Sequence, residues 1–245
     1  MMKITGYSER GLLNSLFYEI SHSANSCSLI NKLVSCATFP FTTSKPIIVD
    51  GEILIEQSFS DFGDADIIIL FTDDKNQGSS IFIEAKVKCD QKGDWSIEKE
   101  YDKFKSGLQK KVASSNLFAQ LYHKLRLVQG LREGGIEKLK SGVEFPKWST
   151  RTNRKIGSNQ VVLRATEQLQ HNVEKTFFLM LIPDQIDRVE QFFQSTINQT
   201  NLKEIPFWDL KMFGYLTWKQ VFDFCRDSEL IHTIDVFDFN KGQIF

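Results

Sequence analysis

The chain has 245 residues and a formal net charge of −1 at pH 7, and its 41% hydrophobic and 25% charged residues are typical of a globular protein. No apolar run approaches the ~20 residues that cross a bilayer, and no basic-then-apolar signal peptide begins the chain. The four cysteines are scattered without paired spacing, which predicts reduced thiols and excludes a disulfide framework. These features predict a cytoplasmic protein without membrane contact.

The first predicted element is an amphipathic helix over residues 7–24. Four residues at helical spacing form its apolar stripe: Leu13, Leu16, Phe17 and Ile20. Glu9 lies one turn before Leu13 on this stripe, so its carboxylate needs a partner. If Glu9 has no role at a metal site, its carboxylate is expected to pair with Arg10 or to interact favourably with the positive end of the helix dipole. Glu19 is expected to point to solvent.

A second helix is expected over residues 28–38, ended by Phe39-Pro40-Phe41. Strands are expected over residues 46–50 and 52–60, and Asp50-Gly51 between their apolar residues is a two-residue hairpin signal. Together with the two strands that follow, this pattern predicts a helical start and then a four-stranded mixed sheet.

Two further apolar runs, residues 67–71 and 81–83, flank a polar turn and predict a hairpin of largely buried strands. Asp66 stands at the head of the first run, and Glu84 and Lys86 follow the second. Because residues i and i+2 of a strand point to one face, Glu84 and Lys86 project together, and the neighbouring strand can bring Asp66 alongside.

This cluster of charges predicts a metal site. Two close carboxylates repel each other unless a cation compensates, and Mg²⁺ typically uses one or two carboxylates together with phosphate and water. A lysine beside the metal could position a water or neutralise phosphate charge. The sequence therefore predicts a phosphodiester hydrolase that depends on Mg²⁺ or Mn²⁺. The alternative is a cross-strand Glu–Lys pair on a solvated face.

Residues 63–69 (GDADIII) and 81–86 (IFIEAK) resemble the core of the PD-(D/E)xK nuclease superfamily, which includes many restriction endonucleases and repair or recombination nucleases. The resemblance covers roughly the first half of the chain and implies a restriction-endonuclease-like core. It also implies that Asp66 and Glu84 are the Mg²⁺ ligands and that Lys86 is the catalytic lysine.

Ala65 occupies the place of the proline in the family pattern. This departure leaves open whether Asp64 or Asp66 is the ligand, and Asp66 is preferred because it directly precedes the apolar run. In the resembled family an acid of the first helix commonly approaches the metal, which gives Glu9 that role. The carbonyl of Ala85 could add a further ligand.

The pattern over residues 96–131 predicts one long helix or two shorter ones. In some branches of the superfamily a Gln on the helix after the Glu-x-Lys motif reaches the active site. Gln109 and Gln120 are the candidates for this role, and the alternative is that both are ordinary polar helix residues.

Residues 99–164 carry 15 Lys+Arg and 5 Asp+Glu, a balance of +10 that leaves −11 for the remainder. Concentrated positive charge predicts a polyanion partner, since phosphate neutralisation drives nucleic-acid affinity. The alternative is a set of solvated helix faces. Residues 132–164 are expected to form an irregular basic loop that contacts phosphates and stacks a Trp on a base or sugar. The candidate nucleic-acid-binding residues are Lys110, Lys111, Lys147, Trp148, Arg151, Arg154 and Lys155.

The C-terminal third continues the α/β pattern. Residues 175–182 form an apolar run typical of a buried strand, and apolar residues from Ile186 to Ile197 follow at helical spacing. A further strand is expected over residues 213–216. Thr217 and Gln220 then match a capping box that opens a helix.

We therefore expect one α/β domain over residues 1–245, with a mixed central β-sheet flanked by helices. Its parts would be a core over about residues 1–130, the basic loop over about 132–164 and an α/β extension over 165–245. The expected function is a Mg²⁺-dependent endodeoxyribonuclease, with restriction, defence or repair as its setting. RNA is not excluded as substrate, and a homodimer could cut both strands. The alternative is a catalytically silent nuclease-fold protein that binds nucleic acid or another partner.

Overall fold

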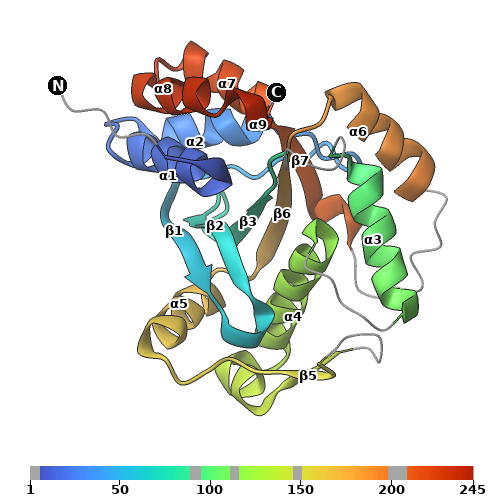
Figure 1. The fold of residues 1–245 in the computed structure, drawn as a ribbon. Helices are drawn as coiled ribbons and strands as arrows, with labels where there is room; N and C mark the ends of the chain where they lie inside the picture. Colours follow the sequence, from blue (N-terminus) through green and yellow to red (C-terminus); the bar gives the residue numbers. More distant parts are fainter. Residues whose placement is uncertain (1–5, 89–94, 111–115, 146–150, 198–208, 245) are drawn as a thin grey trace. The chain divides into compact units, whose positions relative to one another are not determined.

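The computed structural model describes residues 6–88, 95–110, 116–145, 151–197 and 209–244. A five-stranded mixed sheet in the order β1-β2-β3-β6-β7 is flanked by helices (Figure 1). The strands are β1 Asp50–Ser58, β2 Asp64–Thr72, β3 Gly78–Ala85, β6 Lys175–Ile182 and β7 Phe213–Thr217. This confirms the predicted α/β class with a mixed central sheet. The restriction-endonuclease-like core stays a prediction.

The described helices and short strands complete the architecture. Within the described ranges, no helix is both long enough and apolar enough to span a bilayer. The helices are α1 Ser8–Ser21, α2 Ser26–Ser35, α3 Ile97–Lys110, α4 Leu117–Ser141, α5 Gln160–Gln170, α6 Ile186–Phe192, α7 Trp218–Asp227, α8 Ile231–Phe239 and α9 Lys241–Ile244. The shorter elements are the 3₁₀ turns η1 Ser60–Phe62 and η4 Leu210–Met212, the π-helical turn η2 Phe193–Ile197, and the strands β4 Val143–Glu144 and β5 Asn153–Arg154.

The chain divides into two compact units, and β3 and β6 each contribute to both. That the two units form one domain stays a prediction. Unit 1 comprises Met1–Val49, Ala85–Ile97 and Leu179–Phe245, and unit 2 comprises Asp50–Glu84 and Glu98–Phe178.

In unit 2, the predicted hairpin of buried strands is confirmed. β2 pairs antiparallel with β3, from Ile67 opposite Ile83 to Thr72 opposite Gly78. The turn between them is closed by Asp73, whose Oδ1 accepts hydrogen bonds from two backbone N–H groups that follow it, each at 2.9 Å. Bonding to backbone N–H groups favours the ionised carboxylate, so the pKa of Asp73 is lowered.

The strand predicted over residues 46–50 is wrong, and β1 begins at Asp50. The backbone of Ile48 is hydrogen-bonded to the side chain of Asn31. The Asn31 Nδ2 donates to the Ile48 carbonyl at 2.6 Å, and the Asn31 Oδ1 accepts from the Ile48 N–H at 2.9 Å. Ile47 and Val49 are exposed, at 52% and 59%. The side chain of Asn31 therefore takes the place of a neighbouring strand here, and the described residues of the first half form three strands instead of the expected four.

The prediction of an irregular segment over residues 132–164 is also wrong in part. α4 continues to Ser141 across a kink at Gly134 and Gly135, and Gly135 has a positive φ of 62°. Glycine tolerates this backbone conformation, so the helical pattern resumes after it. The short strands β4 and β5 and the start of α5 at Gln160 also lie within this segment.

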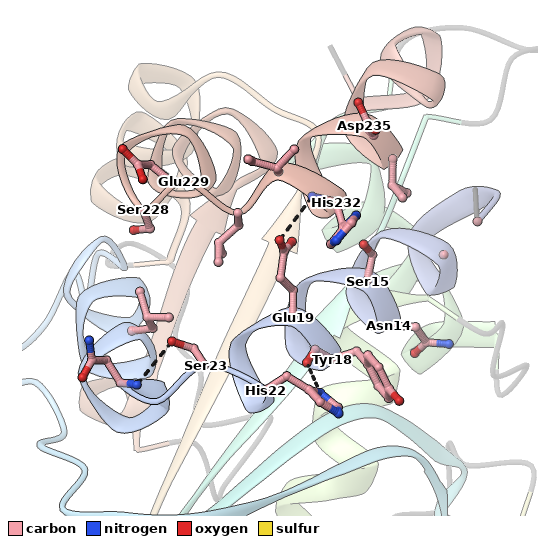
Figure 2. A pocket seen from close by; sticks show the side chains of 17 residues that line it. Asn14, Ser15, Tyr18, Glu19, His22, Ser23, Ser228, Glu229, His232 and Asp235 are labelled. Carbon is pink, nitrogen blue, oxygen red and sulfur yellow. Dashed lines mark hydrogen bonds between the residues drawn. The ribbon is translucent and has the colours of Figure 1, made fainter. Parts of the chain in front are cut away.

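In unit 1, α1 and α8 pack against each other. The expectation that Glu19 points to solvent is wrong. Its Oε2 accepts hydrogen bonds from the Thr233 N–H at 2.8 Å and the Thr233 hydroxyl at 2.7 Å, and its Oε1 accepts from the His232 N–H at 3.2 Å (Figure 2). The first N–H groups of a helix have no intrahelical acceptor, so a carboxylate at this position stabilises α8.

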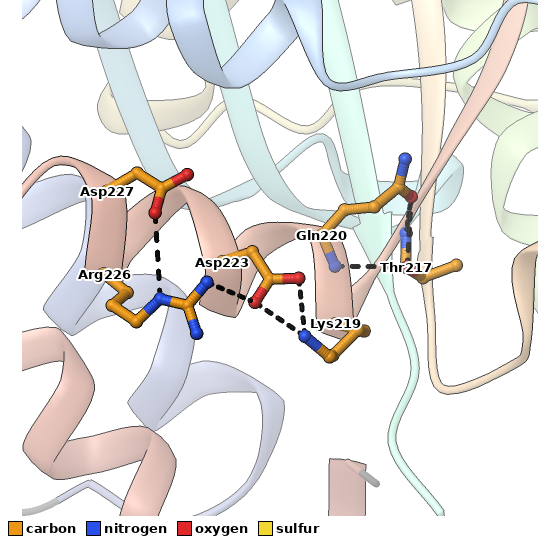
Figure 3. A network of polar contacts seen from close by, with 6 residues as sticks. All are labelled: Thr217, Lys219, Gln220, Asp223, Arg226 and Asp227. Atoms are coloured by element: carbon orange, nitrogen blue, oxygen red, sulfur yellow. Dashed lines mark hydrogen bonds and ion pairs between the residues drawn. The ribbon is translucent and has the colours of Figure 1, made fainter.

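The predicted capping box at the start of α7 is confirmed (Figure 3). The Thr217 hydroxyl accepts from the Gln220 N–H at 3.3 Å, and the Gln220 Oε1 accepts from the Thr217 N–H at 2.8 Å. Further along the helix, Lys219 pairs with Asp223 at 2.6 Å on a more exposed face.

We expect Thr217→Ala to lower the free energy of unfolding by about 1 kcal/mol, because the substitution removes a helix cap. Asp223→Ala serves as the matched control on the same helix, where loss of exposed ion pairs should change stability by less than about 1 kcal/mol. Urea unfolding followed by circular dichroism measures both. A larger effect for Asp223→Ala than for Thr217→Ala would contradict the assignment.

Candidate active site

Asp66 and Glu84 lie on neighbouring strands of unit 2. The last registered pair of the hairpin is Ile67 opposite Ile83, and continuing the antiparallel register by one residue places Asp66 opposite Glu84. Directly opposite residues of an antiparallel pair project to the same face. By this extension of the register, the two carboxylates that the sequence singled out would lie side by side.

A lysine from a distant segment joins this pair. Lys124 of α4 places its Nζ 3.6 Å from the Glu84 Oε1, and the side chains are 1% and 0% exposed. The same Nζ donates a hydrogen bond to the Phe62 carbonyl at 3.1 Å. Asp66 is half-buried and Asp64 is exposed. The site therefore has a buried ion pair at its base and further carboxylates nearer the surface.

The electrostatics of Lys124 are set by two opposing effects. Burial lowers its pKa, since removal from water disfavours the charged amine. Glu84 is the strongest influence that raises the pKa, and Asp66 and Asp64 add to it. Burial prevails, so the pKa of Lys124 lies below that of an ordinary lysine. Such an amine gives up its proton more readily than a surface lysine does.

Local capping fixes the start of the helix that carries Lys124. The Asn116 side chain accepts a hydrogen bond from the Ala119 N–H at 2.9 Å. Glu100 of α3 accepts from the Leu117 N–H, also at 2.9 Å. These contacts hold the first turn of α4 and so set the register in which Lys124 meets β3.

The sequence reasoning missed Lys124, although a signal was present. Lys124 lies seven residues after Leu117 and three after Leu121, within the apolar stripe of the predicted helix. A lysine at such a position is on the buried face, where it needs an anionic partner. The pattern shows that a partner is needed, but its identity comes from the fold.

The other predicted residues of the motif belong to unit 1. Ala85 is buried and ends β3, and the division of the chain falls between Glu84 and Ala85. The Lys86 N–H donates to the Leu181 carbonyl at 2.8 Å, and the Lys86 carbonyl accepts from the Trp218 Nε1 at 2.7 Å. The backbone of Lys86 is therefore fixed within unit 1, and its catalytic role stays a prediction.

Glu9 also lies in unit 1. It is half-buried in the first turn of α1, where a carboxylate suits the helix dipole. Its predicted approach to a metal, like the predicted ligation by the Ala85 carbonyl, stays a prediction.

Residues 151–157 of the basic segment form an ion pair and hydrogen bonds with η1, the turn that directly precedes β2. The Asp61 carboxylate pairs with Arg151, and its Oδ2 accepts from the Lys155 N–H at 3.2 Å. The Gly157 N–H donates to the Ser60 hydroxyl at 2.8 Å. Because η1 leads into Asp64 and Asp66, these bonds place the exposed side chains of Arg151 and Lys155 close to the start of the strand that carries the carboxylates.

Arg154 has a different environment from its neighbours. Its guanidinium is buried, donates to the Asp61 carbonyl and lies 5.0 Å from the centroid of the Phe145 ring. Burial lowers its pKa, whereas Asp61 raises it. These contacts hold the loop against η1. Among the other candidates, Lys111, Lys147 and Trp148 lie outside the described residues, as do the side chains of Lys110 and Gln109.

Gln120 lies in the first turn of α4, where its backbone N–H donates to the Asn116 carbonyl at 2.9 Å. Its side chain is half-buried. The two alternatives for Gln120, a place in the active site or an ordinary polar role on the helix, both stay predictions.

His123, the residue next to Lys124, is half-buried. His123 packs against the Phe145 ring, with 5.6 Å between ring centroids. Burial is the main cause that lowers the pKa of His123 to about 3, and the charges of Arg154 and Lys124 act in the same direction. His123 is therefore neutral at physiological pH.

This low pKa predicts a pH-dependent stability. The ordinary pKa of a histidine is 6.5. Below this pH the unfolded chain binds a proton at His123 that the native chain does not bind. The stabilisation that neutral His123 gives the native state is therefore complete above pH 6.5 and is lost as the pH falls toward 3. Between pH 7 and pH 5 the free energy of unfolding of wild type should fall by about 2 kcal/mol more than that of His123→Phe. Urea unfolding at both pH values measures this difference. Equal losses in the two proteins would refute the prediction.

The two carboxylates fit a hard divalent cation. Mg²⁺ is commonly held by one or two carboxylates, with water and substrate phosphate completing its shell. Among the described residues, no group of three or more His, Cys, Asp and Glu is placed to hold a metal. A site at Asp66 and Glu84 would therefore rely on water and substrate for its remaining ligands.

Comparisons with known proteins found no family model, curated protein or solved structure that matches the chain.

The buried pair itself is testable by its stability. Lys124→Met should lower the free energy of unfolding by about 3–5 kcal/mol, because Glu84 stays buried without its cation. The double variant Glu84→Leu/Lys124→Met should recover this loss and equal or exceed wild type by about 1–4 kcal/mol. Urea unfolding measures both variants.

Lys140→Met is the matched control, since it removes a lysine of the same helix that pairs with Glu137 on the surface. Its effect should stay below about 1 kcal/mol. A double variant as unstable as Lys124→Met alone would show that the loss does not come from the buried charge of Glu84.

Proposed function

We propose that the chain hydrolyses phosphodiester bonds of DNA in a reaction that depends on Mg²⁺ or Mn²⁺. The observation that carries this proposal is the arrangement in unit 2: two carboxylates opposite each other on neighbouring strands, with a buried lysine beside one of them. Carboxylates and a lysine at one place are the groups that metal-assisted phosphodiester hydrolysis requires. The resemblance of residues 63–69 and 81–86 to the PD-(D/E)xK pattern supports the same function.

Each residue would have a distinct task. Asp66 and Glu84 would hold the metal, which when bound supplies Lewis acidity and lowers the pKa of a bound water. Lys124 would balance the charge of Glu84 and place a cation or a transferable proton beside the reacting groups. Lys86 remains the lysine that the sequence motif favours, so the proposal contains two candidates for the catalytic cation.

The basic segment supports a nucleic-acid substrate. Arg151 is 63% exposed and Lys155 is exposed, and both are fastened beside η1 at the start of β2. Positive side chains at this position could bind the phosphates on either side of the scissile bond. In this proposal the site contacts the phosphate and not the sugar. RNA would therefore be cleaved as well, unless neighbouring residues distinguish ribose from deoxyribose.

The test is cleavage of plasmid DNA, single-stranded DNA and RNA with Mg²⁺ or Mn²⁺. Asp66→Asn and Glu84→Gln should each lower the rate on the order of a hundredfold or more, since each removes charge from the metal site. Asp74→Asn, a substitution of an exposed acid in the β2–β3 turn, should leave it unchanged. Cleavage that persists in the first two variants would show that another site, or a contaminant, is responsible.

The same assay separates the two lysines. Normal activity of Lys124→Gln and no activity of Lys86→Gln would assign the catalytic role to Lys86. The reverse result would assign it to Lys124. Thermal unfolding of both variants distinguishes a lost role from a lost fold. A wild-type protein that binds DNA in a salt-sensitive way but cuts no substrate would favour the silent binding module instead.

A further inference from the structure

The central sheet ends at β1, and among the described strands only β2 pairs with it (Figure 1). The last strand at the other end of the order, β7, has a different environment. All five of its residues are buried, and Tyr215 exchanges two backbone hydrogen bonds with Thr38, each at 2.9 Å. Within the described residues, the chain therefore adds backbone bonds to β7 beyond its sheet partner and adds no strand to β1.

The first six residues of β1 form a regular strand with an accessible edge. Their register with β2 runs without interruption from Asp50 to Ile55, and it is disturbed at Glu56, which has a positive φ of 50°. Asp50, Gly51 and Glu52 are exposed, and the apolar side chain of Ile55 is 38% exposed. An edge strand directs alternate backbone N–H and C=O groups away from its sheet, where they can bond to a further strand.

The charges of β1 determine which strand suits this edge. Asp50, Glu52 and Glu56 are its charged residues, and all three are exposed acids. Gln168 of α5 donates to the Glu52 Oε2 at 2.8 Å, a contact that leaves the negative charge of Glu52 in place. Like charges that face each other across two strands are destabilising, and opposite charges are stabilising. A second copy of β1 would bring only further acids, so a basic strand is the favoured partner.

We propose that β1 binds an extended basic segment of a partner protein as an additional strand. The backbone of the segment would bond to residues 50–55, and these bonds would supply affinity. Directly opposite residues share a face of the sheet, so lysine or arginine would lie opposite Asp50 and Glu52, and apolar side chains opposite Ile53 and Ile55. The proposal does not depend on the proposed nuclease activity.

Fluorescently labelled peptides, capped at both ends, test the proposal on the full chain. The basic probe Val-Thr-Val-Arg-Thr-Lys is designed to lie antiparallel to residues 50–55, and its acidic analogue has glutamate in place of both basic residues. Because the two peptides differ only in charge, the basic probe should bind about tenfold or more tightly. Fluorescence anisotropy measures both affinities.

Backbone methylation separates strand pairing from simple charge attraction. Alternate residues of a strand direct their N–H groups to the same side, so methyl groups on alternate nitrogens block one edge of the peptide and spare the other. Two versions of the basic probe, methylated at the odd or at the even positions, have the same charge. One version should bind about tenfold or more weakly than the other, since only one edge of the peptide bonds to β1.

A charge reversal connects binding to β1. Glu52→Lys should weaken binding of the basic probe about threefold or more and strengthen binding of the acidic analogue. Glu52 is exposed, so the fold should survive, and circular dichroism checks this. Glu137→Lys is the matched control, because it reverses the charge of an acid on α4 whose side chain is 82% exposed. Its affinities should equal those of wild type.

Four results would overturn the proposal. The acidic analogue could bind as tightly as the basic probe, the two methylated versions could bind equally, Glu52→Lys could leave both affinities unchanged, or no probe could bind at millimolar concentration. Sedimentation tests the other occupant: a wild-type dimer that Glu52→Gln strengthens would assign the edge to a second copy of the chain and would likewise overturn the proposal.

Discussion

The buried ion pair between Glu84 and Lys124 is the constraint around which the candidate site in unit 2 is arranged. It joins the end of a central strand to a helix that lies forty residues further along the chain. Removing two charges from water is expensive, and apolar side chains of similar size would often stabilise a core more. A pair of this kind weakens the argument for a purely structural role, because a core built for stability alone would not require it. In the proposed function, the same two charges would act with Asp66 on a metal and a phosphate.

The hairpin around this pair could be predicted from the sequence because its information is local. Short β-branched runs bounded by turn residues predicted β2 and β3, and the alternation of side chains along a strand predicts that Asp66 lies alongside Glu84. Lys124 could not be assigned in this way, since the helix pattern shows only that a lysine sits on a buried face. The strand predicted around Ile48 was wrong for a related reason: the bonding partner is the side chain of Asn31, and no local pattern signals that contact.

A count of Lys and Arg residues in the basic segment overstates the positive charge that is available to a partner. Several of its cations serve the fold: Arg126 donates to the Glu144 carbonyl at 2.7 Å, and Arg132 donates to the Val173 carbonyl at 2.7 Å. Arg154 likewise holds the loop to η1. These side chains donate hydrogen bonds to backbone carbonyl groups, so their charge is not presented to a partner in the way that a count suggests. Arg151 and Lys155 are better candidates for phosphate contact because they are exposed beside the carboxylates.

Some acidic side chains bond to backbone N–H groups, and others do not. This difference separates the acids that serve the fold from those of the candidate site. Glu19, Asp73 and Glu100 each accept hydrogen bonds from backbone N–H groups at the end of a helix or within a turn. Such carboxylates complete the hydrogen bonding of the fold, and their charge is explained by it. Glu84 is different, since its partner is another buried charge and its neighbour across the ladder is Asp66. Glu84, a buried acid whose charge the backbone does not explain, is therefore the one to which we assign chemistry.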